Sequence, residues 1–295
     1  MITILDGGMG RELEQSGAPF RQPEWSALAL MEAPEAVRAA HDRFVAAGSD
    51  VITTNSYACI PFHIGAERFD ARGRELIALA ARLAREAADA ADRDVKVAGA
   101  IPPLFGSYNP ASFDAAQASA ILTPLIEAQA PDIDFWLIET VSSAEEGLFV
   151  TRALQKTGKP IWLSFTLDDD PAEGAVLLRD GQPLTEALAA IKDAEIEAVL
   201  FNCSRPETIT PAIAVAAKAL SGQDVQIGAY ANTFAIEIET GHQANNIITP
   251  LRQSLSANTE RYKEFAEKWI ADGATIIGGC CGISPAHIAA LTALR

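Results

Sequence analysis

Short apolar runs alternate with longer amphipathic stretches along this 295-residue chain, and the alternation occurs eight times. The apolar runs, rich in β-branched residues, predict strands at 2–5, 51–54, 95–98, 135–138, 161–165, 198–201, 225–229 and 274–277. The amphipathic stretches predict helices at 34–47, 71–91, 113–128, 144–156, 184–192, 206–220, 259–271 and 285–294. Ser284 followed by Pro285 is typical of an N-cap and first-turn pair at the start of the last helix.

Eight strand–helix units with nearly continuous apolar strands indicate parallel strands that are buried on both faces. Because eight such units close a barrel, we expect an α/β protein with a single (β/α)8 TIM barrel over residues 1–295. An open doubly wound sheet is the alternative, and it usually brings a G-x-G-x-x-G loop after its first strand. The first strand is followed by Asp6-Gly7-Gly8-Met9-Gly10, which lacks that spacing.

One segment interrupts the regular alternation. Residues 237–256, rich in Asn, Thr and Gly, predict a long loop after strand seven. This segment is either a functional loop or a surface loop without a role, and the sequence leaves both alternatives open.

The charge of the chain limits its partners. A formal net charge of −16 and the lack of a Lys and Arg cluster argue against nucleic acid and anionic membrane surfaces as partners. The first residues do not form a signal-peptide pattern, and no apolar run has the length that crosses a membrane. With four cysteines in the chain, we expect a cytoplasmic protein whose thiols serve a metal or catalysis.

Polar and sulfur-containing residues follow the predicted strands at the point where each strand ends. In a (β/α)8 barrel the C-terminal strand ends meet at one rim, where active sites lie. Strands six and eight flank strand seven, so their cysteines converge on one position. The residues at this rim are Asp6, Asn55, Glu139, Cys203, Asn232, Cys280 and Cys281.

The neighbouring cysteines Cys280 and Cys281 need a bent backbone, because adjacent side chains on a strand point to opposite faces. The flanking glycines permit that bend. Together with Cys203 they form a three-thiolate set that suits zinc, with a fourth position open as in catalytic sites. Cys59, in an apolar setting, is expected to be a core residue. For Cys203 the alternative is a buried core residue. For Cys280 and Cys281 the alternatives are packed free thiols or a strained disulfide.

The tryptophans and histidines offer little further chemistry. Trp25, Trp136, Trp162 and Trp269 have no spacing that indicates a stacking platform, so packing is expected for them. The four histidines show no metal-ligand spacing.

The motifs together resemble a known family. They are Asp6 to Glu14 (DGGMGRELE), Thr54-Asn55-Ser56-Tyr57, Glu139-Thr140, Phe201-Asn202-Cys203 and Gly279-Cys280-Cys281. In order and spacing they resemble the zinc-dependent homocysteine S-methyltransferases over nearly the whole chain. That family includes betaine- and S-methylmethionine-dependent enzymes and the homocysteine module of cobalamin-dependent methionine synthase. The resemblance implies a (β/α)8 barrel, zinc, and methyl transfer to the sulfur of homocysteine to form methionine.

The resemblance also implies roles for individual residues. Zinc on Cys203, Cys280 and Cys281 would take the substrate sulfur as its fourth ligand. Asn232, in Tyr230-Ala231-Asn232-Thr233, resembles the family's Tyr-Pro-Asn segment and would offer its oxygen to zinc before substrate arrives. A hydrogen-bonding loop residue is the simpler interpretation of Asn232.

The substrate amine and carboxylate have partners at the same rim. Asp6 and Glu139 resemble the family's acidic residues that hold the amine. Backbone N–H groups around Gly7 and Gly8 would receive the carboxylate. The remaining pocket candidates, for which plain packing is the alternative, are Thr54, Asn55 and Tyr57.

The methyl donor is less well defined than the acceptor. The compact length favours S-methylmethionine or S-adenosylmethionine, while betaine, a methylated folate and a corrinoid remain open. His242, in segment 237–256, is a weak candidate for donor binding. Two other functions stay open: a zinc- and thiol-binding barrel without turnover, and a metal-free redox protein that uses the neighbouring cysteines. The redox function is the less favoured alternative, because the two cysteines lack the two-residue spacer of common redox motifs.

Overall fold

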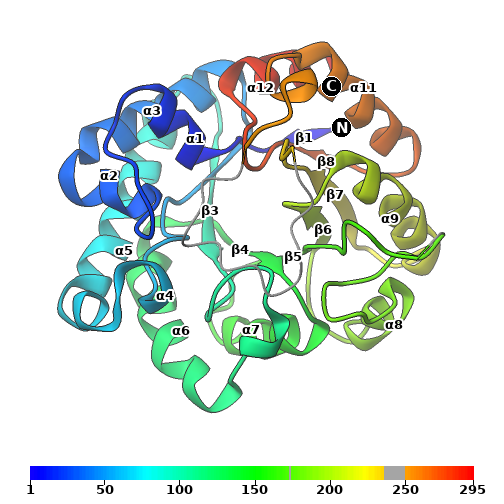
Figure 1. The fold of residues 1–295 in the computed structure, drawn as a ribbon, viewed down its shortest axis with the longest axis horizontal. Coiled ribbons are helices and arrows are strands. Elements are labelled where there is room, and N and C mark those ends of the chain that lie inside the picture. The colour runs from blue at the N-terminus through cyan, green and yellow to red at the C-terminus, as the bar shows by residue number, and fades with distance from the viewer. Residues whose placement is uncertain (173, 236–249) are drawn as a thin grey trace.

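Eight parallel strands lie around a central axis, and the helices form a ring outside them (Figure 1). The structure is a computed structural model that describes residues 1–172, 174–235 and 250–295. The strand order around the barrel is β1-β8-β7-β6-β5-β4-β3-β2. The predicted (β/α)8 barrel is therefore confirmed.

Each predicted strand coincides with a strand of the barrel. The strands are β1 (Thr3–Ile4), β2 (Val51–Thr53), β3 (Lys96–Ile101), β4 (Phe135–Val141), β5 (Ile161–Phe165), β6 (Ala198–Asn202), β7 (Gln226–Tyr230) and β8 (Ile276–Ile277). Every residue of β5 and β6 is buried, because one face points into the barrel and the other packs against helices. This double burial explains why the strands read as continuous apolar runs.

The eight predicted helices are all present. They are α3 (Pro34–Ala47), α5 (Ala66–Asp89), α6 (Ala115–Gln129), α7 (Ala144–Gln155), α8 (Leu184–Ala190), α9 (Pro206–Ala219), α11 (Thr259–Ala271) and α12 (Pro285–Leu291). Helix α5 begins five residues before its predicted start, at the residue that follows Gly65. The predicted N-cap of α12 is confirmed, and the His287 side chain completes a capping box with Ser284.

Short elements fill the connections, and the pattern analysis predicted none of them except the turn Thr292–Leu294, which forms the end of the helix predicted at 285–294. They are α1 (Met9–Gln15), α2 (Ser26–Glu32), α4 (Pro61–Ile64), α10 (Gln253–Ser256) and the 3-10 turns Pro110–Ser112, Ala130–Asp132 and Thr292–Leu294. At four to seven residues, the helices among them are too short to show a clear apolar period.

Strands β1 and β2 meet at a seam that is held by separate hydrogen bonds. The Asp50 amide donates to the Ile4 carbonyl at 2.7 Å, and the Ile4 amide donates to Asp50 Oδ2 at 2.9 Å. One step further along, the Thr53 amide donates to Asp6 Oδ2 at 2.7 Å. A side-chain carboxylate thus takes the place of a backbone carbonyl at this end of the seam.

The barrel interior is filled from below. Its apolar cluster includes Leu137, Leu200 and Ile276, and the tilted rings of Phe135 and Trp162 have centroids 4.2 Å apart near the start of their strands. A second cluster fills the layer between strands and helices. Trp136 and Trp269 are fully buried, as expected of packing residues. This apolar filling lies below the C-terminal strand ends, which is where barrel active sites are found.

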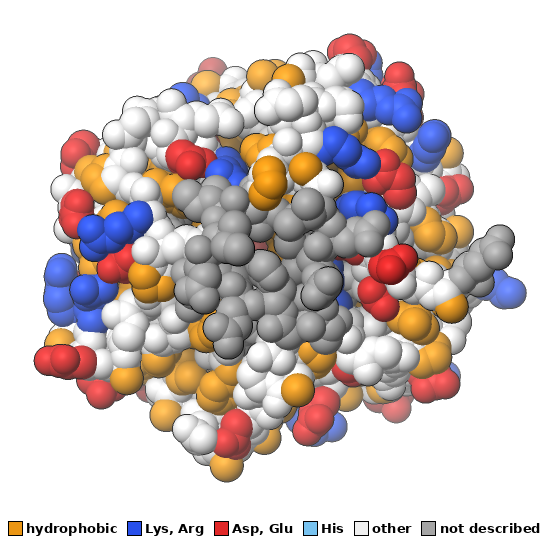
Figure 2. Space-filling view, viewed as in Figure 1, with side chains coloured by type: hydrophobic (Ala, Val, Ile, Leu, Met, Phe, Trp, Pro, Cys, Tyr) orange, Lys and Arg blue, Asp and Glu red, His pale blue; other side chains and the backbone are white. Residues whose placement is uncertain are grey.

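Part of the predicted loop 237–256 falls outside the described residues, as does His242. Its described end, residues 250–256, includes α10 and a bridge between Leu251 and Phe234. Where the chain is described, no helix has the length and apolar character needed to span a membrane. On the face shown in Figure 2, Lys and Arg side chains alternate with Asp and Glu rather than forming one basic patch.

Candidate active site

A pocket opens at the C-terminal ends of the strands, where the sequence places its polar residues. Four non-glycine residues of the described chain have a left-handed backbone, and all four line this pocket. They are Trp25 (φ 50°), Tyr108 (φ 61°), Thr140 (φ 61°) and Cys203 (φ 50°). Such conformations cost on the order of 1–3 kcal/mol each and persist where the surroundings hold them, as at functional sites.

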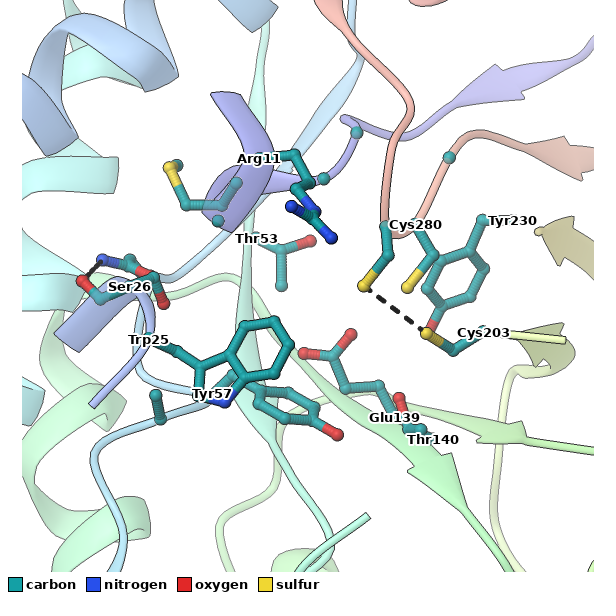
Figure 3. Close-up of a pocket in the computed structure, with 18 of the residues that line it drawn as sticks. Arg11, Trp25, Ser26, Thr53, Tyr57, Glu139, Thr140, Cys203, Tyr230 and Cys280 are labelled. Atoms are coloured by element: carbon teal, nitrogen blue, oxygen red, sulfur yellow. Dashed lines mark hydrogen bonds between the residues drawn. The ribbon is translucent and has the colours of Figure 1, made fainter. Parts of the chain in front are cut away.

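Three sulfurs converge on one wall of the pocket (Figure 3). The Sγ atoms of Cys203, Cys280 and Cys281 lie within 4.8 Å of one another, and those of Cys203 and Cys281 are 3.7 Å apart. All three are free thiols. Hydrogen bonds from Cys280 and Cys281 hold the pKa of Cys203 well below its usual range. The pKa of Cys280 is raised, first by its hydrogen bonds with Cys203 and Cys281 and then by burial. The cluster therefore favours at least one thiolate.

The backbone around the neighbouring cysteines is fixed by contacts with β7 and α11. The Cys280 amide donates to the Ala231 carbonyl at 2.9 Å, and the Tyr262 hydroxyl donates to the Gly278 carbonyl at 2.7 Å. Gly279 is required for space, because a Cβ there would lie 2.1 Å from Ile283 Cγ2. The glycines thus serve close packing as well as the bend that the sequence predicted.

Asn202 connects three strands beneath the sulfurs. Its Oδ1 accepts hydrogen bonds from the Thr140 amide at 2.8 Å and from Ser164 Oγ at 2.7 Å. Its Nδ2 donates to Thr140 Oγ1 at 2.8 Å. Since Thr140 follows Glu139 and Asn202 precedes Cys203, one buried amide fixes both the acidic and the sulfur side of the pocket.

Glu139 lies inside β4, two residues before its end, and not directly after the strand as predicted. The register between β4 and β5 shifts between Ile138 and Val141, and Thr140 is left-handed there. This irregularity turns the Glu139 side chain into the pocket (Figure 3). A polar residue that interrupts an apolar run can mark either a bulge within a strand or the end of that strand, and the sequence pattern does not distinguish the two.

Asp6 and Glu139 form a buried acidic pair. Burial raises the pKa of Asp6 to about 7, although two hydrogen bonds from Thr53 act against it. Burial, the charge of Asp6 and that of Cys203 raise the pKa of Glu139 to about 8. Among the described residues, no Lys, Arg or His forms an ion pair with either carboxyl group. In the described part of the chain, the pocket therefore presents two acids that are not ion-paired.

The sequence comparisons bear on this geometry. A family model described as homocysteine S-methyltransferase matches residues 3–294. The chain belongs to the homocysteine S-methyltransferase family. It is therefore placed among the methyltransferases, as the motifs predicted.

Members of this family resemble the chain over nearly their full lengths. Homocysteine S-methyltransferase of Escherichia coli K12 is 29% identical over 99% of this chain and 94% of its own. Selenocysteine methyltransferase of Astragalus bisulcatus is 24% identical over 96% of this chain and 89% of its own. The crystal structure of the homocysteine methyltransferase MmuM from E. coli in its metallated form matches with a TM-score of 0.81 and 27% identity, and the match covers 100% of this chain and 96% of that one.

The chemistry of the donor set can be tested against a metal of the kind predicted. Tetrahedral zinc with Zn–S bonds of about 2.3 Å requires sulfurs about 3.8 Å apart. The separation of 3.7 Å between Cys203 and Cys281 agrees with that value. Soft thiolate ligands also suit zinc. The three cysteines therefore fit the ion.

The three further residues predicted for the pocket, Thr54, Asn55 and Tyr57, all line it. Tyr57 lines the pocket, and its hydroxyl lies 2.5 Å from Ser107 Oγ. Thr54 hydroxyl donates to Gln129 Oε1 at 2.7 Å, and Asn55 Nδ2 donates to the Ser26 carbonyl at 3.1 Å. Thr54 and Asn55 thus line the pocket with side chains that are already hydrogen-bonded within the protein, and these bonds position the loop after β2.

The glycine-rich turn offers less than the sequence implied. The Gly8 amide already donates to the Ile283 carbonyl at 2.8 Å, which leaves the Gly7 amide as the candidate for a carboxylate.

Asn232 is placed as a loop residue. Its Oδ1 accepts a hydrogen bond from the Phe234 amide at 3.1 Å, it does not line the pocket, and its Nδ2 is buried without a partner. This geometry matches the simpler interpretation of Asn232.

Several residues of the pocket were not predicted. Trp25 was expected to pack, but it lines the pocket opposite the cysteines, beside Tyr57 (Figure 3). Arg11 points its guanidinium toward the cysteines and pairs with Glu14 at 2.6 Å. Tyr108 lies in the loop after β3. The only signal in the sequence for Tyr108 is that its loop follows a strand and therefore lies at the rim formed by the C-terminal strand ends. Cys59 is buried in the core as predicted, and burial raises its pKa to about 12.

Proposed function

We propose that this protein transfers a methyl group from a small sulfonium donor, S-methylmethionine or S-adenosylmethionine, to the sulfur of homocysteine, and that it uses zinc. The observation that carries the proposal is the meeting, in one pocket, of three sulfurs and two buried carboxyl groups that form no ion pair with a described residue. Homocysteine carries a thiol at one end and an ammonium at the other, so it matches both groups at once.

Cys203, Cys280 and Cys281 would hold the zinc. When bound there, zinc supplies positive charge that favours the thiolate form of a fourth sulfur at neutral pH. The tyrosine rings of Tyr57, Tyr108 and Tyr230 around the site limit the access of water.

Asp6 and Glu139 would hold the substrate ammonium. Both carboxyls pay a desolvation cost that the raised pKa values reflect, and a bound cation between them offsets that cost. The Gly7 amide is the candidate partner for the substrate carboxylate. These contacts at the amino-acid end orient the sulfur toward the cysteine wall.

The donor would enter on the side of Trp25 and Tyr57, opposite the sulfurs (Figure 3). Aromatic faces attract cations, and a sulfonium carries its positive charge next to the methyl group to be transferred. In the reaction, the methyl–sulfur bond of the donor breaks and a methyl–sulfur bond to homocysteine forms. The donor leaves as a neutral thioether, and the thiol proton of homocysteine passes to solvent.

Methionine formation from homocysteine across a panel of donors tests the proposal. The panel contains S-methylmethionine, S-adenosylmethionine, betaine and methyltetrahydrofolate. Selenocysteine should be included as an acceptor, because a relative is named for that activity. Turnover with a sulfonium donor is expected; turnover only with betaine or the folate would reject the donor assignment. Homocysteine binding without turnover from any donor would favour the alternative of a binding barrel.

Metal analysis tests the ligand set separately. The purified protein should contain about one zinc per chain, and changing Cys203, Cys280 or Cys281 to Ala should remove most of it. Cys59→Ala is the matched control, because that thiol lies in the core away from the cluster. Full zinc occupancy in Cys280→Ala would reject the ligand assignment. A reversible disulfide with little retained zinc would favour the redox alternative.

A further inference from the structure

The hydroxyl group of Tyr108 points at one of the three sulfurs. It donates a hydrogen bond to Cys203 Sγ at 3.0 Å, and both side chains are buried. Both residues also have a left-handed backbone. Two strained residues from loops almost a hundred positions apart thus meet in a single contact, which requires other groups to hold each of them in place.

The Tyr108 ring is held from behind by a cation. The Arg179 guanidinium lies over the ring at 4.6 Å from its centroid. Arg179 is itself fixed by a buried ion pair with Asp169 at 2.9 Å, in which the side chains are 0% and 2% exposed, and by a hydrogen bond from its Nε to Thr166 Oγ1 at 3.2 Å. A desolvated cation–π contact of this kind stabilises the ring position and polarises the phenol.

The Asp169–Arg179 ion pair also contacts the loop that carries Cys203. Asp169 Oδ1 accepts a hydrogen bond from the Arg205 amide at 2.9 Å, two residues after Cys203. The chain from Asp169 through Arg179 and Tyr108 to Cys203 therefore forms a closed set of contacts.

The loop that carries Tyr108 is anchored on its other side as well. The Leu104 amide donates to Glu146 Oε1 at 3.0 Å, and Ser107 Oγ contacts the Tyr57 hydroxyl.

We infer that Tyr108 is a positioning residue for the metal ligand Cys203. Its hydroxyl orients the sulfur toward the other two and withdraws electron density from it, while Arg179 holds the ring at the required distance. The inference rests on the proposed metal site. It goes beyond that site because it assigns Cys203 a hydroxyl donor at 3.0 Å, whereas Cys280 has only a long contact of 4.0 Å from Asn202 Nδ2, and this difference makes the ligands unequal. Groups that orient metal ligands commonly affect metal affinity by 10–100-fold.

Cobalt(II) substitution separates this role from a structural one, because the sulfur-to-cobalt charge-transfer bands report electron density on the thiolates. Tyr108→Phe keeps the ring and its contact with Arg179 and removes only the hydroxyl. We expect the bands to move to lower energy and zinc affinity to fall by about tenfold. Tyr230→Phe is the matched control, since among the described residues its buried hydroxyl has no hydrogen-bond partner, and its bands should match those of the native protein.

Arg179→Lys provides a second variant, because it retains a charge for Asp169 but loses the planar group over the ring. It should move the bands in the same direction by a smaller amount. Unchanged bands together with zinc affinity within twofold of native in Tyr108→Phe would overturn the inference. If native protein with cobalt(II) shows no thiolate bands at all, the metal site itself is rejected, and this inference with it.

Discussion

Asp6 accepts two hydrogen bonds from Thr53, one from its amide to Oδ2 at 2.7 Å and one from its hydroxyl to Oδ1 at 3.1 Å. The same carboxyl group lines the pocket. A single side chain therefore joins the barrel seam between β1 and β2 to the proposed ammonium site. Barrel closure and substrate binding depend on different properties of that group, namely its acceptor oxygens and its charge.

Substitution of Asp6 should separate these two properties. Asp6→Asn keeps an oxygen for the Thr53 amide and offers an NH2 group to the Thr53 hydroxyl, so the seam should survive. Loss of the charge should weaken homocysteine binding at least about tenfold. Asp6→Ala removes both acceptors and should also lower the free energy of unfolding by about 1–3 kcal/mol. Calorimetric titration and denaturant unfolding measure the two effects.

Thr53→Val is the control for the Asp6 series, because it removes the hydroxyl but keeps the amide donor. Its homocysteine affinity should stay within about threefold of native, the size of a neutral hydrogen bond. An Asp6→Asn protein that binds homocysteine as tightly as native protein would contradict the ammonium role.

Glu139 should make ligand binding depend on pH. Its pKa of about 8 and that of Asp6, about 7, mean that the free pocket holds protons at neutral pH. A ligand ammonium prefers the ionised carboxylates, so affinity should rise as pH increases from 6 to 8.5. L-Methionine is the appropriate ligand, because it has the ammonium but no thiol that titrates. A rise of about tenfold is expected.

Glu139→Gln should reduce this dependence and weaken L-methionine binding most above pH 8, where the native Glu139 is ionised, while zinc stays bound. Zinc retention distinguishes loss of the ammonium site from loss of the fold. An identical slope in native and variant proteins would show that the Glu139 carboxyl group is not the one that titrates.

Part of the site could be predicted from the sequence, because the order of the strands alone brings its residues together. Asp6, Cys203 and Cys280 stand one to three residues after the ends of apolar runs, and parallel strands bring those ends to one rim. Family motifs then pointed to the same residues.

Tyr108 and Trp25 were not predicted because their positions depend on left-handed backbones inside long connections. Such conformations are imposed by distant partners, Arg179 in the case of Tyr108, and leave no periodic pattern. Glu139 was found, but its place in a bulge was not, because the β4–β5 register shift is a property of the pair of strands.

The stability of the protein should depend on pH through Glu146, which is outside the proposed binding groups. Burial raises the pKa of this carboxyl to about 7, so the folded state keeps a proton that the unfolded chain releases near pH 4.5. The folded state binds more protons between these values, and the free energy of unfolding therefore falls as pH rises from about 4.5 to about 7.

Glu146→Gln should remove that part of the pH dependence. The Gln oxygen still accepts the Leu104 amide, but no charge is buried above pH 7. Relative to native protein, the variant should gain up to about 3 kcal/mol between pH 4.5 and pH 8. Glu145→Gln, next to it and exposed, is the control. Urea unfolding at several pH values measures both, and parallel curves for Glu146→Gln and native protein would refute the effect.

Asn202 should couple the sulfur and acidic sides of the pocket. Asn202→Ala leaves the Thr140 amide and the Ser164 hydroxyl without their buried acceptor and should cost about 2–4 kcal/mol of stability. Because Thr140 adjoins Glu139 and Asn202 adjoins Cys203, zinc affinity and L-methionine affinity should fall together. Ser164→Ala removes only one donor, so its cost should be about 1 kcal/mol with both affinities close to native. Loss of zinc affinity alone in Asn202→Ala would show that Thr140 holds its left-handed backbone without the Asn202 amide, and that the two sides of the pocket are independent.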